Sequence, residues 1–205
     1  MSRTATETPT DTPTRALERH PSPWRIAAWS AASLVLLIPL IAMQVTDEVV
    51  WSVNDFVFAG ALVLSVGIPL ELAVRASTDP AYRWAVSVAL VATFLLVWLS
   101  LGVGIIGADG DPANLLYGVV LAVGVLGALV VRARPRGMAR VMAATALAQA
   151  SVAMGALVAG LGAPYSGPLQ IVVLNGGFVA LWVGAALLFR RAARTPSHAT
   201  QAQGG

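Results

Sequence analysis

Six long apolar runs are spaced along this chain of 205 residues, at about 26–45, 56–74, 84–106, 114–131, 139–161 and 169–189. A helix rises 1.5 Å per residue, so a run of about 20 apolar residues crosses the hydrocarbon core of a bilayer, which is about 30 Å thick. Only 11% of the residues are charged, whereas a soluble domain has roughly 25%. The sequence therefore predicts an all-α integral membrane protein, a bundle of six transmembrane helices.

The two ends of the chain differ in composition from these runs. Residues 1–24 are rich in threonine, proline and charge, so we expect a disordered cytoplasmic tail. A signal peptide is the alternative, but its apolar region spans about 7–15 residues and ends in an A-x-A-like site. The run from Ile26 to Val45 is longer and ends MQVTDE. We therefore interpret residues 25–192 as the transmembrane domain and residues 193–205 as a second disordered cytoplasmic tail.

The basic residues fall on one side of the predicted membrane. All thirteen are arginine, and each lies in a terminal tail or at the connections after the second and fourth runs. The other loops, at about 46–55, 107–113 and 162–168, contain no basic residue. By the positive-inside rule, both termini are cytoplasmic. A nucleic-acid-binding surface is not expected, because the arginines flank apolar helices and do not gather on a soluble surface.

The composition also indicates which membrane to expect. The chain has no lysine and is rich in alanine, glycine, valine and arginine, which is typical of a GC-rich bacterial genome. We therefore expect a multi-pass protein of the bacterial cytoplasmic (inner) membrane.

Local signals mark several helix starts. Asp79-Pro80 and Asp111-Pro112 each place a capping carboxylate before a proline at the first helical position, and Asn54-Asp55 is a candidate cap for the second run. We therefore interpret residues 107–113, within LSLGVGIIGADGDPANLLYG, as a short external capping turn. A calcium site using Asp109, Asp111 and Asn114 is the alternative, but the EF-hand spacing is absent.

Several segments carry a resemblance to a known group of proteins. They are NDFVFAG, ELAVR, AYRWAV, FLLVWLSLGVGIIGADGDPANLLYG and RGMARVMAATALAQA. Over about residues 44–195 the chain resembles a family of small, uncharacterised bacterial inner-membrane proteins. Asp111 stands before the proline where that pattern would have a residue such as asparagine. The resemblance implies a topology, and it implies neither an activity nor a site.

Residue types that carry most enzyme chemistry are scarce in the predicted bundle. The chain has no cysteine, and its two histidines, His20 and His198, lie in the predicted tails. No Ser-His-Asp set can be assembled within the spans, and no phosphate-binding glycine loop is present. We therefore expect a protein that is not an enzyme and that uses no cofactor or metal.

Three polar residues within the spans are the candidate site residues. Glu71 is the only acid within a span, and an intramembrane acid is by default a functional hypothesis. Its alternative role is a same-helix ion pair with Arg75, four residues later. Gln149 and Asn175 are amides in the fifth and sixth runs, which either bond neighbouring helices or line a polar pocket.

An internal period is weakly visible in the same runs. Asn54, Asn114 and Asn175 recur about 60 residues apart, each early in an alternate helix. Three duplicated helical hairpins would produce this spacing, and so would coincidence.

Two functions fit these observations. The first is a non-enzymatic structural or partner-binding membrane protein, whose partner is a second copy or another membrane protein. The alternative is a small-solute transporter, or the substrate-binding subunit of one, with a polar pocket around Glu71, Gln149 and Asn175. In both cases the protein contacts the lipid bilayer, and anionic head groups are expected near Arg132, Arg134, Arg136 and Arg140.

The arginine pattern makes a testable prediction about topology. A reporter fused after Arg194 and one inserted near Thr78 should both read cytoplasmic, while one near Gly110 should read periplasmic. Paired phosphatase and fluorescent-protein fusions measure this. A cytoplasmic signal at Gly110 would contradict the six-span topology.

Overall fold

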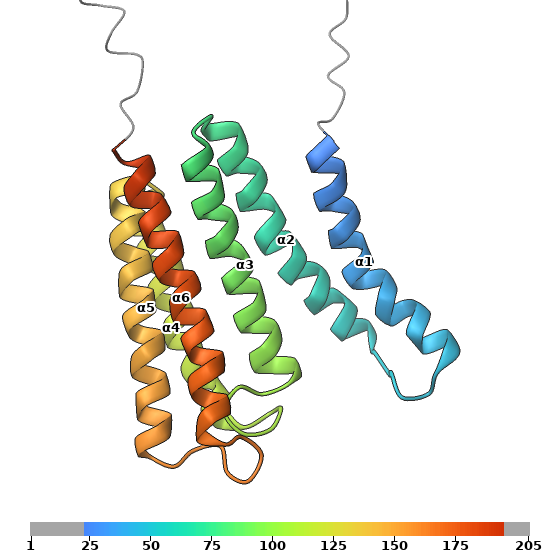
Figure 1. Cartoon of the computed structure of the whole chain (residues 1–205). Helices are drawn as coiled ribbons and strands as arrows, with labels where there is room; N and C mark the ends of the chain where they lie inside the picture. The colour runs from blue at the N-terminus through green and yellow to red at the C-terminus, as the bar shows by residue number, and fades with distance from the viewer. Residues whose placement is uncertain (1–22, 195–205) are drawn as a thin grey trace, which may run out of the picture. The chain divides into compact units, whose positions relative to one another are not determined.

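The computed structural model describes residues 23–194, and within that range it contains helices and no strand. The predicted tails fall almost entirely outside the described residues, and so do His20 and His198. The helices are α1 (Pro23–Val45), α2 (Val53–Ala76), α3 (Pro80–Gly102), the 3-10 helix η1 (Pro112–Leu115), α4 (Leu116–Val130), α5 (Pro135–Val158) and α6 (Pro168–Ala192) (Figure 1).

Five of these segments are long and apolar enough to cross a membrane: α2, α3, η1 with α4, α5 and α6. They coincide with the predicted second to sixth runs and indicate a multi-pass membrane protein. The predicted first run corresponds to α1, in which the stretch Ala32–Val45 is a shorter apolar helix. The chain divides into two compact units at residue 50, so α1 is described by itself. Pro39 lies within α1, and Leu34, Ile38 and Ile41 are exposed on it.

The helix starts confirm two of the three predicted caps. The Asp79 carboxylate accepts a hydrogen bond from the N–H of Ala81 at 2.8 Å, and Asp111 accepts one from Ala113 at 2.8 Å. Asn54-Asp55 is not the cap of α2. Helix α2 begins earlier, at Val53, and Ser52 caps it through a capping box with Asp55.

The core of the second unit is formed by α3, α4, α5 and α6. Helix α3 packs against α2 on one side and against α6 on the other, and α5 packs against both α6 and α4 (Figure 1). The buried positions of α3 are mostly small and follow a helical repeat: Ala85, Ala89, Ala92, Leu96 and Ser100. Small residues let helix backbones approach closely, which is how helices associate in lipid.

The arginine-bearing ends of the helices lie at one end of this unit. Tyr82, near the start of α3, donates a hydrogen bond to the carbonyl of Ala133 in the α4–α5 turn at 3.2 Å, and its ring contacts Phe189 near the end of α6. Arg83 donates to the carbonyls of Ser77 and Val74, at 2.7 and 3.0 Å. These contacts tie the α2–α3 and α4–α5 turns to the end of α6.

The segment after α3 differs from the prediction. The third run was predicted to continue to residue 106, but α3 ends at Gly102. Ile105 and Ile106 are instead fully buried in a non-helical loop. Gly104 permits the chain reversal, because its φ is +80° and a Cβ there would clash with the backbone of Ala108. The prediction placed these isoleucines in the helix because hydropathy reports only that they are apolar, and not whether their backbone is helical.

One side chain organises this loop. The Oδ1 atom of Asn114 accepts hydrogen bonds from the N–H groups of Ile105 and Ile106 at 2.9 and 3.1 Å, and its Nδ2 donates to the carbonyls of Ile106 and Ala108. Ser166, from the α5–α6 connection, donates to the carbonyl of Gly107 and accepts from its N–H. The segment is therefore a capped turn, as predicted, that is also held into the bundle. Two of the residues of the alternative calcium site are therefore in different surroundings. Asn114 Oδ1 accepts hydrogen bonds from backbone N–H groups, whereas Asp109 is exposed.

Replacing Asn114 should destabilise the fold more than replacing either nearby acid. Asn114→Ala leaves buried N–H and carbonyl groups without partners, at about 1–3 kcal/mol each, so we expect a loss of at least about 2 kcal/mol. Asp111→Ala should cost about 0.5–2 kcal/mol through the lost cap. Asp109→Asn is the control and should be neutral. Unfolding in detergent measures all three. Equal stabilities for the Asn114 and Asp109 variants would contradict this account.

Candidate functional site

A cluster of three polar side chains lies inside the bundle. Tyr117, Gln149 and Asn175 come from α4, α5 and α6, and each is at most 1% exposed. The Oδ1 atom of Asn175 accepts a hydrogen bond from the Tyr117 hydroxyl at 2.9 Å and another from Gln149 Nε2 at 2.8 Å. Its Nδ2 donates to the carbonyl of Ile171 at 2.8 Å. One amide therefore links three helices; we call these residues the polar cluster.

The local sequence explains why these residues face inward. On α5, Met138, Val141 or Met142, Thr145 and Gln149 are buried at helical spacing, so the amide follows an apolar stripe. Thr145 satisfies its own hydroxyl by donating to the carbonyl of Val141 at 2.9 Å. On α6, Ile171, Asn175, Phe178 and Trp182 form the corresponding buried stripe. The cluster is set into two packed faces and is shielded from the surface.

Not every polar atom in this region has a partner. Gln149 Oε1 is buried and makes no hydrogen bond with the described residues, and the same holds for Ser100 Oγ and Trp182 Nε1. A buried acceptor without a partner is costly in an apolar environment. Gln149 Oε1 is thus the one acceptor of the polar cluster that has no donor among the described residues, and it is enclosed.

Glu71 lies apart from the polar cluster in the packing order. It is on α2, which packs against α3, and α3 lies between α2 and α6 (Figure 1). Arg75 Nε donates to Glu71 Oε1 at 2.8 Å, so the predicted same-helix pair forms. The Glu71 side chain is 16% exposed and that of Arg75 is 66% exposed. The long arginine side chain can therefore carry its charge to the membrane interface.

Of the sequence candidates, the structure joins Gln149 directly to Asn175 and does not add Glu71 to them. Tyr117 was missed by the sequence reasoning, although it is the one tyrosine within a predicted span, where a phenol needs a hydrogen-bond partner. The three periodic asparagines have different surroundings. Asn54 is exposed, Asn114 bonds loop backbone and Asn175 bonds side chains.

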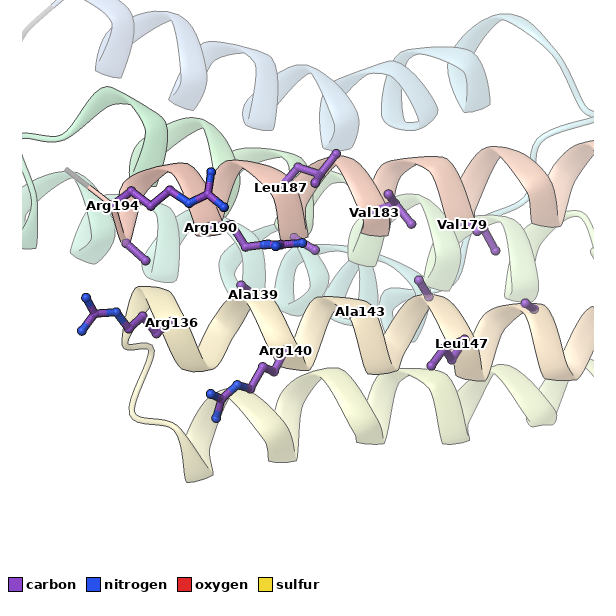
Figure 2. Close-up of a pocket in the computed structure, with 14 residues that line it drawn as sticks. Arg136, Ala139, Arg140, Ala143, Leu147, Val179, Val183, Leu187, Arg190 and Arg194 are labelled. Atoms are coloured by element: carbon purple, nitrogen blue, oxygen red, sulfur yellow. The ribbon is translucent and has the colours of Figure 1, made fainter.

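A second candidate lies on the outside of the bundle. A groove of about 900 Å³ runs between α5 and α6 (Figure 2), and we call it the α5–α6 groove. One end carries Arg136, Arg140, Arg190 and Arg194. The rest is lined by apolar side chains, with Ala139, Ala146 and Ala186 buried at its base and Leu147 and Leu187 exposed at its edges. A neighbouring hollow of about 1090 Å³ shares Arg136 and Arg194 and adds Arg132 and Arg134.

The arginines are positioned by boundaries that differ from the predicted ones. The fifth run was predicted to begin at residue 139, which already included Arg140, but α5 begins at Pro135 and so includes Arg136 as well. The sixth was predicted to end at 189, but α6 continues to Ala192 and includes Arg190.

Within the described residues, no group of three histidine, cysteine or acidic side chains is placed to hold a metal ion.

No family model matches the chain, and neither a curated protein nor a solved structure does. The resemblance to small bacterial inner-membrane proteins therefore stays a prediction.

The polar cluster makes a graded prediction for stability. Tyr117→Phe removes one inter-helix hydrogen bond and should cost about 0.6–1.7 kcal/mol. Asn175→Leu leaves two buried donors without an acceptor and should cost at least about 2 kcal/mol. Asn54→Ala, at an exposed asparagine, is the matched control and should change stability by less than about 0.5 kcal/mol. Reversible unfolding in bicelles measures the series. The cluster would not hold the helices together if Asn175→Leu matched the control.

Proposed function

We propose that this chain is a non-enzymatic membrane protein that binds a partner at its lipid-facing surface, and that its interior serves to hold the helices together. The observation that carries this proposal is that Asn175 uses the central amide to join α4, α5 and α6, while the α5–α6 groove lies on the outside of the bundle. Interior amides used in this way are adhesive. The chain's lack of cysteine and the position of its two histidines near the termini support a role without catalysis.

The large recesses of the second unit support binding at the surface. The α5–α6 groove and the neighbouring hollow are lined by residues of the helix exteriors, including the exposed Leu147 and Leu187, whereas the polar cluster is enclosed. Glu71, the one intramembrane acid, is bonded to Arg75 on its own helix. A polar pocket that combines Glu71 with Gln149 and Asn175 has no support in these contacts.

The proposal includes a topology and a location. We place six helices across the bilayer, with both termini in the cytoplasm of a bacterium and the chain in the inner membrane. The segregation of the arginines supports this orientation, because the turns that carry them meet at one end of the second unit. Arg132, Arg134, Arg136 and Arg140 then face the anionic head groups of the inner leaflet.

One observation favours the alternative function, a small-solute transporter or the substrate-binding subunit of one. Gln149 Oε1 is buried and has no hydrogen-bond partner among the described residues. A solute with a hydrogen-bond donor would satisfy it. In that case Gln149 and Asn175 would bind the solute, and the cluster would have to open for the solute to enter.

A solute screen separates the two functions. Under the surface-binding proposal, sugars, amino acids, polyols and vitamins should neither raise the Tm of the purified protein nor accumulate in proteoliposomes. Gln149→Leu should lower the Tm because it removes the bond to Asn175. Solute-dependent uptake that is lost in Gln149→Leu but kept in Asn54→Ala would overturn the proposal and favour transport.

A further inference from the structure

The charged end of the α5–α6 groove contains four guanidinium groups and no compensating acid. Arg136 and Arg140 lie in the first turns of α5, and Arg190 and Arg194 lie at the end of α6 (Figure 2). None of the described residues that line the groove is acidic, and all four arginines are exposed. Like charges on two neighbouring helices repel, so an anion between them would stabilise this end of the pair.

The N-terminal end of α5 adds to this preference for an anion. The start of α5 has no side-chain cap, because Arg134 at the N-cap position makes no such hydrogen bond. The free N–H groups and the positive end of the helix dipole favour a negative charge there. Guanidinium groups bind phosphate through pairs of parallel hydrogen bonds, and one phosphate has enough oxygens to bind two guanidinium groups at once.

Beyond the arginines, the groove is built for an apolar chain. Its base is formed by alanines at helical spacing on α5: Ala139, Ala143, Ala146 and Ala150. Leu147 on α5 and Val183 and Leu187 on α6 are exposed along its sides. From Arg140 to Ala150 the groove runs about 15 Å at 1.5 Å per residue, which equals half the thickness of a hydrocarbon core of about 30 Å. The groove thus resembles one lipid leaflet in two respects: it is charged at one end and apolar along the rest, and its length is about that of the leaflet's hydrocarbon layer.

From these features we propose that the α5–α6 groove binds an anionic glycerophospholipid. The phosphate contacts Arg140 and Arg190, and one acyl chain lies on the alanines. The neighbouring hollow, which shares Arg136 and Arg194, has room and charge for a second phosphate, so cardiolipin binds more tightly than phosphatidylglycerol. This inference rests on the proposed function, because it names the partner that the lipid-facing surface binds.

A second copy of this chain fits the groove less well. In a two-fold symmetric dimer the same surfaces meet, so the four arginines of each copy would approach those of the other. Like charges that face each other across an interface disfavour association. A helix from a partner would also extend across the whole bilayer, whereas the groove covers one leaflet.

The test uses the full-length protein, purified in mild detergent and freed of lipid. Native mass spectrometry gives dissociation constants for cardiolipin, phosphatidylglycerol, phosphatidylcholine and inorganic phosphate. We expect the tightest saturable binding for cardiolipin, weaker binding for phosphatidylglycerol, and no saturable binding for phosphatidylcholine or inorganic phosphate. Equal binding of phosphatidylcholine, or a match between inorganic phosphate and the lipids, would overturn the proposal.

Two pairs of variants locate the site. Arg140→Gln with Arg190→Gln should weaken cardiolipin binding at least tenfold. Arg75→Gln removes a charge from an exposed arginine that lines neither the groove nor the neighbouring hollow, and should change binding less than twofold. Ala143→Phe fills the groove and should weaken binding at least fivefold, whereas Ala144→Phe, at an exposed position of α5 outside the groove, should not. The Tm of each lipid-free variant shows whether it is folded. If the glutamine variant is unstable, Arg140→Lys with Arg190→Lys replaces it, because this variant keeps the charge and removes the paired hydrogen bonds of the guanidinium groups.

Unchanged cardiolipin binding in both groove variants would overturn the inference. A change in oligomeric state with unchanged lipid binding would also overturn it and assign the groove to a protein partner. Neither result depends on the solute screen, because solute uptake in proteoliposomes tests the proposed function separately from lipid selectivity in detergent.

Discussion

The amide of Asn175 is the interaction on which the packing of α4, α5 and α6 depends. Lipid chains are as apolar as leucine, so the hydrophobic effect does not press helices together within a bilayer. Adhesion must come from close packing and from hydrogen bonds that have no competing water. Asn175 accepts from Tyr117 and Gln149 and donates within its own helix, so it connects all three helices through one side chain.

The same constraint explains the loop after α3. Backbone that is neither helix nor sheet leaves N–H and carbonyl groups unpaired, and within a membrane protein such backbone is tolerated where protein groups pair it. Asn114 supplies an acceptor for Ile105 and Ile106 and donors for two carbonyls, while Ser166 pairs both backbone groups of Gly107. The loop can therefore bury two isoleucines at the end of the bundle.

Much of this architecture could be predicted from the sequence. Hydropathy located the helices α2 to α6, and the pairs Asp79-Pro80 and Asp111-Pro112 gave helix starts, because these signals are local. The loop with Ile105 and Ile106 was not predicted, since hydropathy does not distinguish a buried loop from the last turn of a helix. Grouping Glu71 with Gln149 and Asn175 was unsupported for a related reason. Spacing along one helix predicts the pair with Arg75, but which helices are neighbours depends on packing.

The groove and the polar cluster are two consequences of how α5 and α6 face each other. On α5, Gln149 lies on the buried face next to Ala150, where the groove ends, and its bond to Asn175 fixes the separation of the two helices at that depth. At the other end, the groove is lined by Arg136 and Arg140 of α5, by Arg190 of α6 and by Arg194 just after α6, and these like charges repel one another. The two helices are therefore hydrogen-bonded at one end of the groove and carry like charges at the other, and the alanine surface lies between these two points. Stability of the bundle and access to the groove therefore depend on different residues of the same two helices.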